Sequence, residues 1–137
     1  MSLFRIFDIA ASGMTAQSTR LNTVSSNLAN ADSVSSSAGG AYRARQPVFA
    51  ATLNDVFNAS SDVKAKVLGI VESQEPLQQR YAPTHPLANE DGYIFMPNVN
   101  TVEEMANMIS ASRSYQANVE VVNTSKQMLL RILSLGD

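Results

Sequence analysis

The chain has 137 residues, which is enough for one domain with its own core but too few for two large ones. Its net charge of −2 is spread evenly along the sequence, so there is no basic stripe and nucleic acid is not an expected partner. The absence of cysteine excludes disulfides, cysteine-ligated zinc, iron–sulfur clusters and thiol catalysis.

The first 30 residues contain the clearest helical periodicity. Seam residues recur at alternating steps of four and three, which is the heptad pattern of a helix that packs against another helix. They are Leu3, Phe7, Ala10, Met14, Gln17, Leu21, Val24 and Leu28. Gly13 and the many Ser and Thr residues lower the helix propensity, so packing must stabilise this segment. Arg5 and Asp8 interrupt its apolar character, and we therefore expect neither a signal peptide nor a spanning helix.

Residues 31–97 have a different character. The Ser/Gly-rich stretch 31–40 predicts a flexible link, and residues 41–97 predict a small β-rich module. The strand candidates are 42–50, 63–72, 77–81 and 93–96. Pro47 indicates that the first of them is an edge strand or breaks there, and Asn89–Gly92 is typical of a turn.

The C-terminal segment, residues 98–137, predicts the second long helix. Thr101 and Glu104 have the spacing of a capping box at its start. One seam contains Met105, Met108, Ser112, Tyr115, Val119, Val122, Lys126, Leu129 and Leu133. A second apolar edge contains Ile109, Val121, Met128, Ile132 and Leu135. The apolar arc beyond Val119 is therefore wide, and a helix of this kind must be covered by more than one neighbour.

These elements predict an α+β fold, in which the terminal helices pair as an antiparallel, coiled-coil-like hairpin with the β-rich module inserted between them. Periodicity alone leaves two interpretations open: a self-contained hairpin, or one spoke of a helical bundle shared among subunits. The wide apolar arc favours the shared bundle. The residues expected to form its assembly interface are Phe7, Met14, Leu21, Val24, Leu28, Met108, Tyr115, Val119, Val122, Met128, Leu129 and Ile132.

The sequence contains no constellation of catalytic or metal-ligating residues. His85 is the only histidine and is flanked by prolines in a Pro-Thr-His-Pro segment, so a structural role is expected for it. Glu103 and Glu104 are adjacent on a helix and point about 100° apart, so they cannot flank one substrate bond. The helix dipole explains carboxylates in a first turn. We therefore expect a non-enzymatic protein without a cofactor or metal.

More specific than any periodicity are several short segments. Near the N-terminus these are 11–17 (ASGMTAQ) and 20–31 (RLNTVSSNLANA), and near the C-terminus 110–118 (SASRSYQAN) and 122–128 (VNTSKQM). Between them are 84–88 (THPLA), 91–93 (DGY) and 96–99 (MPNV). Together they resemble the bacterial flagellar axial proteins of the rod and hook. The middle segments narrow the resemblance to the proximal rod, and it covers nearly the whole chain, including its short length without a large middle domain.

The resemblance implies a structural subunit of the proximal rod of the flagellar basal body, located in the periplasm and needed for motility. Such a subunit would assemble through its terminal helices into a helical tube that transmits torque. Its implied partners are copies of itself, other rod subunits, and the membrane-embedded ring and export apparatus at the rod base. It would leave the cytoplasm through the type III export apparatus, without a cleaved signal peptide.

Three alternatives to a proximal-rod subunit remain open at this point. The first is a soluble coiled-coil adaptor or export chaperone, the second is another axial paralogue of the rod or hook, and the third is a small-molecule-binding domain that uses methionine-rich helix faces. The adaptor would explain the seams but not the β-rich module. The binding domain would need a closed apolar pocket.

Overall fold

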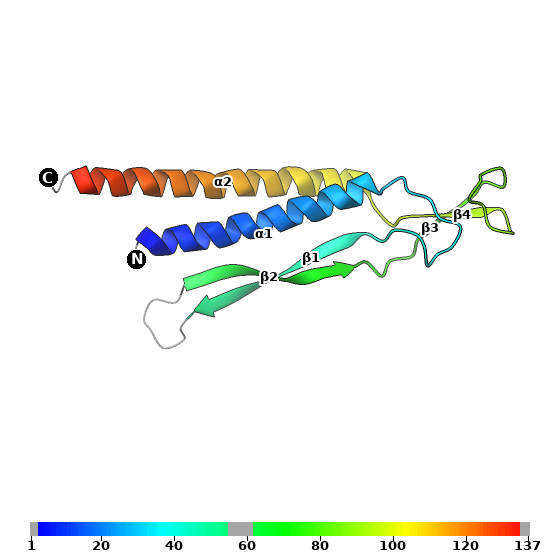
Figure 1. Ribbon diagram of the computed structural model, residues 1–137, viewed down its shortest axis with the longest axis horizontal. Coiled ribbons are helices and arrows are strands. Elements are labelled where there is room, and N and C mark those ends of the chain that lie inside the picture. Colours follow the sequence, from blue (N-terminus) through cyan, green and yellow to red (C-terminus); the bar gives the residue numbers. More distant parts are fainter. Residues whose placement is uncertain (1–2, 55–61, 135–137) are drawn as a thin grey trace.

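The computed structural model describes residues 3–54 and 62–134, which form two long helices and four strands (Figure 1). In chain order these are α1 (Leu3–Ala29), β1 (Arg45–Asn54), β2 (Asp62–Glu72), β3 (Gln78–Tyr81), β4 (Tyr93–Met96) and α2 (Thr101–Ser134). The predicted α+β fold is confirmed. The first strand begins later than predicted because Tyr42 packs against the core cluster instead of joining the ladder.

The two helices form an antiparallel hairpin, and α2 extends past the start of α1 at the end where both chain termini lie (Figure 1). Their register is given by two contacts, Gly13 with Asn118 and Arg20 with Asn107. Counting ten residues outward from the first contact places Leu3 opposite Met128. The last turns of α2 therefore have no part of the described α1 beside them.

In the α2 seam that packs against α1, every second residue lies one position earlier in the sequence than predicted. The row that packs there consists of Glu104, Ala111, Asn118 and Ser125. The sequence placed the neighbouring row in this position, yet Met105 is 57% exposed and Lys126 is also exposed. Apolarity was the wrong guide here because small and hydrogen-bonding side chains allow the two backbones to approach closely.

The start of α2 is also different from the prediction. The Asn100 side-chain oxygen accepts hydrogen bonds from the amides of Val102 (3.2 Å) and Glu103 (3.4 Å). The Glu104 amide bonds to the Asn100 carbonyl at 2.9 Å, so Thr101 is the first helical residue and the Thr101–Glu104 capping box does not form. Asn is as effective an N-cap as Ser or Thr. The side chain of Glu104 is consequently left to turn toward α1.

The two sheets occupy different places along the molecule. β1 and β2 form a long antiparallel hairpin that packs along α1, whereas β3 and β4 lie beyond the end of the helical hairpin (Figure 1). Leu68 is an extra residue in β2, because Val48 pairs with Gly69 and Phe49 pairs with Val67. A bulge of this kind increases the local twist. The twisted β1–β2 hairpin covers one side of α1 and leaves the outer face of α2 uncovered.

The core of the single chain is small. Ala31, Ala44 and Val99 form a buried cluster against which Tyr42 packs, and the other buried apolar residues include Ala10, Ala16, Val24, Ile94 and Ala111. Ser35 ties the segment after α1 to β4 through two backbone hydrogen bonds with Phe95. The accessible surface is 9330 Å², whereas a compact monomer of this mass exposes about 7,000 Å². Much surface thus remains for other molecules. Within the described ranges, neither helix has an apolar stretch of the kind that crosses a bilayer.

Candidate assembly interface

Asn27 is the polar side chain that joins α1 to the β1 strand. It has no exposed surface. Its side-chain oxygen accepts hydrogen bonds from the Tyr42 hydroxyl and the Arg45 amide, both at 2.9 Å, and its side-chain nitrogen donates to the Arg45 carbonyl at 2.8 Å. Three bonds to one amide group fix where β1 begins relative to the helix.

Glu104 is the buried carboxylate of the helix–helix seam. It is 7% exposed, and its Oε2 atom has no hydrogen-bond partner. Burial raises the pKa of Glu104; a hydrogen bond from Asn27 and the charge of Arg20 act against this rise, while the charge of Glu103 adds to it. Arg20 itself donates to the side chain of Asn107 at 2.8 Å. The contact between α1 and α2 at Glu104 is thus polar and contains one acceptor without a hydrogen-bond donor.

Gly13 is where the two helices come closest to a steric limit. A Cβ atom at this position would lie 2.9 Å from the Asn118 side-chain nitrogen. Any larger residue would therefore displace Asn118 or separate the helices. Ala10, one turn earlier on α1, is also buried, whereas Ala117, next to Asn118 on α2, is exposed.

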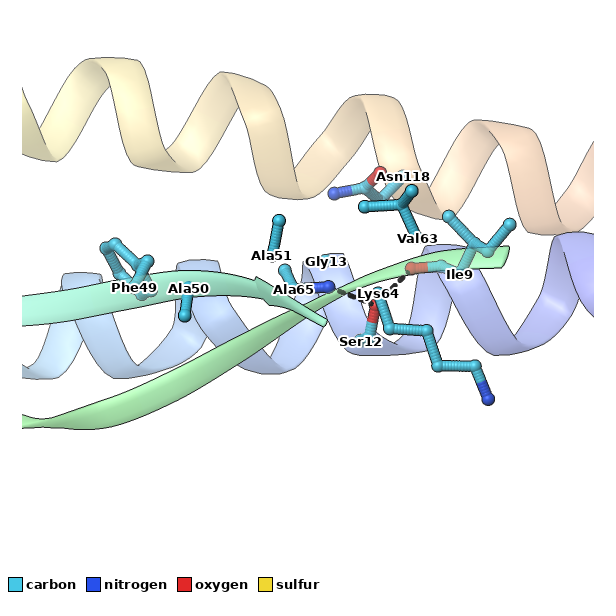
Figure 2. Close-up of a pocket in the computed structure, with 10 residues that line it drawn as sticks. All are labelled: Ile9, Ser12, Gly13, Phe49, Ala50, Ala51, Val63, Lys64, Ala65 and Asn118. Atoms are coloured by element: carbon cyan, nitrogen blue, oxygen red, sulfur yellow. Dashed lines mark hydrogen bonds between the residues drawn. The ribbon is translucent and has the colours of Figure 1, made fainter. Parts of the chain in front are cut away.

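Two further contacts attach β2 to the outer side of α1. The Ala65 amide donates to the Ser12 hydroxyl oxygen at 3.2 Å, and Ser12 in turn donates to the Ile9 carbonyl at 2.7 Å (Figure 2). The Lys64 ammonium lies 3.1 Å from the Asp8 carboxylate. Asp8 is largely exposed, so this ion pair contributes little stability.

Between α2 and the β1–β2 hairpin lie two open hollows that meet at Phe49, with α1 as their floor. The first, about 400 Å³, is mainly apolar and runs from Phe49 to Ile9 and Val63, under Asn118 (Figure 2). The second, about 390 Å³, runs from Phe49 to Glu104. We call the two together the α2–β groove. Neither hollow is a closed apolar pocket, which does not favour the small-molecule-binding alternative.

The predicted interface residues divide into three groups by their exposure in the single chain. Val24 is buried, and the half-buried ones are Phe7, Met14, Leu21, Leu28, Met108, Val119, Val122 and Leu129. Tyr115, Met128 and Ile132 are 38%, 46% and 61% exposed. Since only one chain is present, contacts of these residues with other subunits stay a prediction. Sequence reasoning missed Arg20 and Asn107, and it explained Glu104 by a capping box and the helix dipole. The heptad spacing of Glu104, Ala111, Asn118 and Ser125 was the available signal.

The remaining candidates for chemistry have structural roles. The ring Nδ1 of His85 accepts a hydrogen bond from the Leu87 amide at 3.1 Å, and its backbone takes part in the turns on either side. Asn89 accepts from the amides of Asp91 and Tyr93, and Gly92 has a φ of 82°, as the predicted turn requires. Among the described residues, no three His, Asp or Glu side chains gather in a way that would hold a metal ion.

Both ends of the chain match families of known proteins. Residues 7–35 match the family described as "Flagella basal body rod protein", and residues 90–135 match "Flagellar basal body rod FlgEFG protein C-terminal". The flagellar basal-body rod protein FlgC of Salmonella typhimurium (strain LT2) is 52% identical over 136 residues, with 99% of each chain covered. FlgC of Escherichia coli O6:H1 is 54% identical over the same share of each chain. FlgC of Borreliella burgdorferi is 36% identical over 149 residues and 98% of each chain. This chain therefore belongs to the FlgC family of flagellar basal-body rod proteins, which are structural and not catalytic.

Proposed function

We propose that this chain is a structural subunit of the proximal rod, which assembles through its terminal helices with copies of itself and other rod subunits. The product is a helical tube, in which the packed helices transmit torque from one subunit to the next. The ring in the membrane and the export apparatus at the rod base are its further partners. No reaction and no cofactor are required for this role.

The observation that carries the proposal is the uncovered apolar edge of α2. On this edge Val121, Met128 and Ile132 are 45%, 46% and 61% exposed, and outside it Leu130 and Leu133 are 55% and 62% exposed. Full burial of one such side chain is worth about 1.5–3 kcal/mol. Covering several of them gains a free energy comparable to the whole stability of a small domain, about 5–15 kcal/mol. Neighbouring subunits are the partners that a rod would supply.

A self-contained hairpin is the competing interpretation. It would require the β-rich module to fold back over the apolar edge of α2. In the described part of the chain, β1 and β2 pack along α1, and Met128 and Ile132 stay exposed. The low share of charged residues, 16%, also suits association, because neutral surfaces repel each other weakly.

The test is cross-linking in assembled rods, which the absence of cysteine makes simple. Met128→Cys is combined with a second cysteine on α1, at Phe7 or Leu21, and isolated basal bodies are oxidised. We expect disulfide-linked pairs of chains on a non-reducing gel from rods, but not from a dilute solution of the purified chain. Bridges that form only within one chain would contradict assembly through this edge.

A further inference from the structure

The α2–β groove has a polar end and an apolar end. At the polar end, the Oε2 atom of Glu104 lies buried without a hydrogen-bond donor, in a side chain that is only 7% exposed. At the apolar end, Phe49 and Val63 are 40% and 49% exposed above the floor formed by Ile9 and Gly13 (Figure 2). A buried acceptor without a donor is rare in a native protein structure. The groove therefore suits an occupant that brings a donor to one end and apolar side chains to the other.

The groove is long enough for several turns of a helix. Its floor extends along α1 from Ile9 to Val24, which corresponds to about 23 Å at 1.5 Å per residue. The cations already near Glu104 are engaged elsewhere: Arg20 donates to Asn107, and Arg45 is paired with Glu72 at 3.3 Å. Arg45 and Glu72 offset each other, and the two carboxylates of Glu103 and Glu104 outnumber the one charge of Arg20, so a further ammonium brings the polar end to neutrality.

The end of α2 carries a stripe with the matching order of side chains. Lys126, Leu130 and Leu133 are spaced i, i+4 and i+7, so they lie on one face of the helix. Lys126 is exposed, and Leu130 and Leu133, which lie where α2 extends beyond the described α1, are 55% and 62% exposed. The stripe thus presents an ammonium donor followed by two leucines, over about 10 Å.

We infer that the α2–β groove is the docking site for the Lys126–Leu130–Leu133 stripe of a second copy of this chain, with the Lys126 ammonium donating to Glu104. Copies that follow one another in a helical assembly point the same way, so the α2 helix of the second copy runs parallel to the one that borders the groove. With Lys126 at Glu104, the two leucines of the stripe then extend toward Phe49. This inference rests on the proposed assembly into a rod and adds which surfaces meet.

Zero-length cross-linking tests the contact directly. A carbodiimide joins a carboxylate to an amine only when the two touch. Within one chain, Glu104 and Lys126 are 22 positions apart on the same helix, which separates them by about 33 Å. A Glu104–Lys126 isopeptide found by mass spectrometry in assembled rods therefore joins two chains, and this is the expected result. Linkage of Glu104 to a lysine of another rod protein, or no linkage of Glu104 at all, would overturn the inference.

Charge reversal provides the second measurement. Lys126→Glu changes an exposed side chain, so we expect the purified chain to unfold at the same temperature while the number of assembled rods falls at least about tenfold, the effect of losing about 1.4 kcal/mol of contact free energy. Lys66→Glu, on the exposed side of β2, is the matched control and should leave rod number unchanged. Normal rod numbers with Lys126→Glu would refute the groove contact but leave the rod function intact. The rod function itself fails only if the Met128→Cys cross-links stay within one chain.

Discussion

At the scale of single residues, polar side chains determine where the elements of this chain meet. Asn27 is fully buried and holds β1 through three hydrogen bonds, while Gly13 is small because Asn118 occupies the space beside it. Glu104 is different because its ionised form is only partly satisfied. A residue of this kind lowers the stability of the single chain, and such a residue is expected where a partner completes the site.

The pH dependence of stability tests the state of Glu104. Burial raises the pKa of this carboxyl above its ordinary value of 4.5, so the folded chain holds the proton more tightly than the unfolded chain. The stabilisation that protonated Glu104 gives the folded chain is complete below pH 4.5, and it is lost as the pH rises through the higher pKa of the folded chain. Glu104→Gln should therefore raise the unfolding temperature of the purified chain at pH 7 and have a smaller effect near pH 4.

The control for this measurement is Glu120→Gln, an exposed carboxyl on the same helix, which should change the unfolding temperature little at either pH. An unchanged or lowered unfolding temperature for Glu104→Gln at pH 7 would mean that Glu104 is satisfied within the chain. The same substitution should weaken rod assembly, since glutamine cannot form the ion pair with Lys126. Opposite effects on the single chain and on the rod distinguish a docking residue from a core residue.

At the scale of whole elements, the sequence predicted which segments are helices and strands better than it predicted how α2 faces its neighbour. Heptad spacing and the turn at Gly92 were sufficient for the order of elements and the antiparallel hairpin. The prediction for the row of α2 that meets α1 was wrong by one residue, because the seam was predicted from apolar character, which Glu104 and Ser125 do not have. The α2–β groove was not foreseen, since no local pattern shows that β1 and β2 fold back along α1.

The cap of α2 gives a test at the same scale. Asn100 accepts two hydrogen bonds from the first turn, whereas Thr101 lies within the helix and is exposed. Asn100→Ala should lower the free energy of unfolding by about 1 kcal/mol, within the usual range of about 0.5–2 kcal/mol for an N-cap. Thr101→Ala, one position later, should change it by less than about 0.5 kcal/mol. Denaturant titration of the purified chains measures both, and a larger loss for Thr101→Ala would restore the capping box.

At the scale of the molecule, the chain by itself buries less surface than a compact monomer does. Its accessible surface of 9330 Å² exceeds the value for a compact monomer by about 2,300 Å², and its core cluster is built mainly from alanine and valine. The elongated shape in Figure 1 exposes the end of α2 and one face of the β1–β2 hairpin at the same time. Stability is therefore expected to be unevenly distributed along the hairpin until neighbouring subunits cover it.

Amide hydrogen exchange compares these two states of the molecule. In the dilute purified chain, we expect the amides near Ala111 to be well protected, because they lie where the helices pack most closely. The turns of α2 after Met128 should exchange quickly, since no part of the described α1 lies beside them and Ile132 is 61% exposed. In assembled rods, exchange of these last turns should slow at least about tenfold, which corresponds to about 1.4 kcal/mol of added stability. The amides near Ala111 serve as the internal reference, because their burial does not depend on a neighbour. If the last turns exchanged at the same rate in both states, the end of α2 would not be an assembly surface.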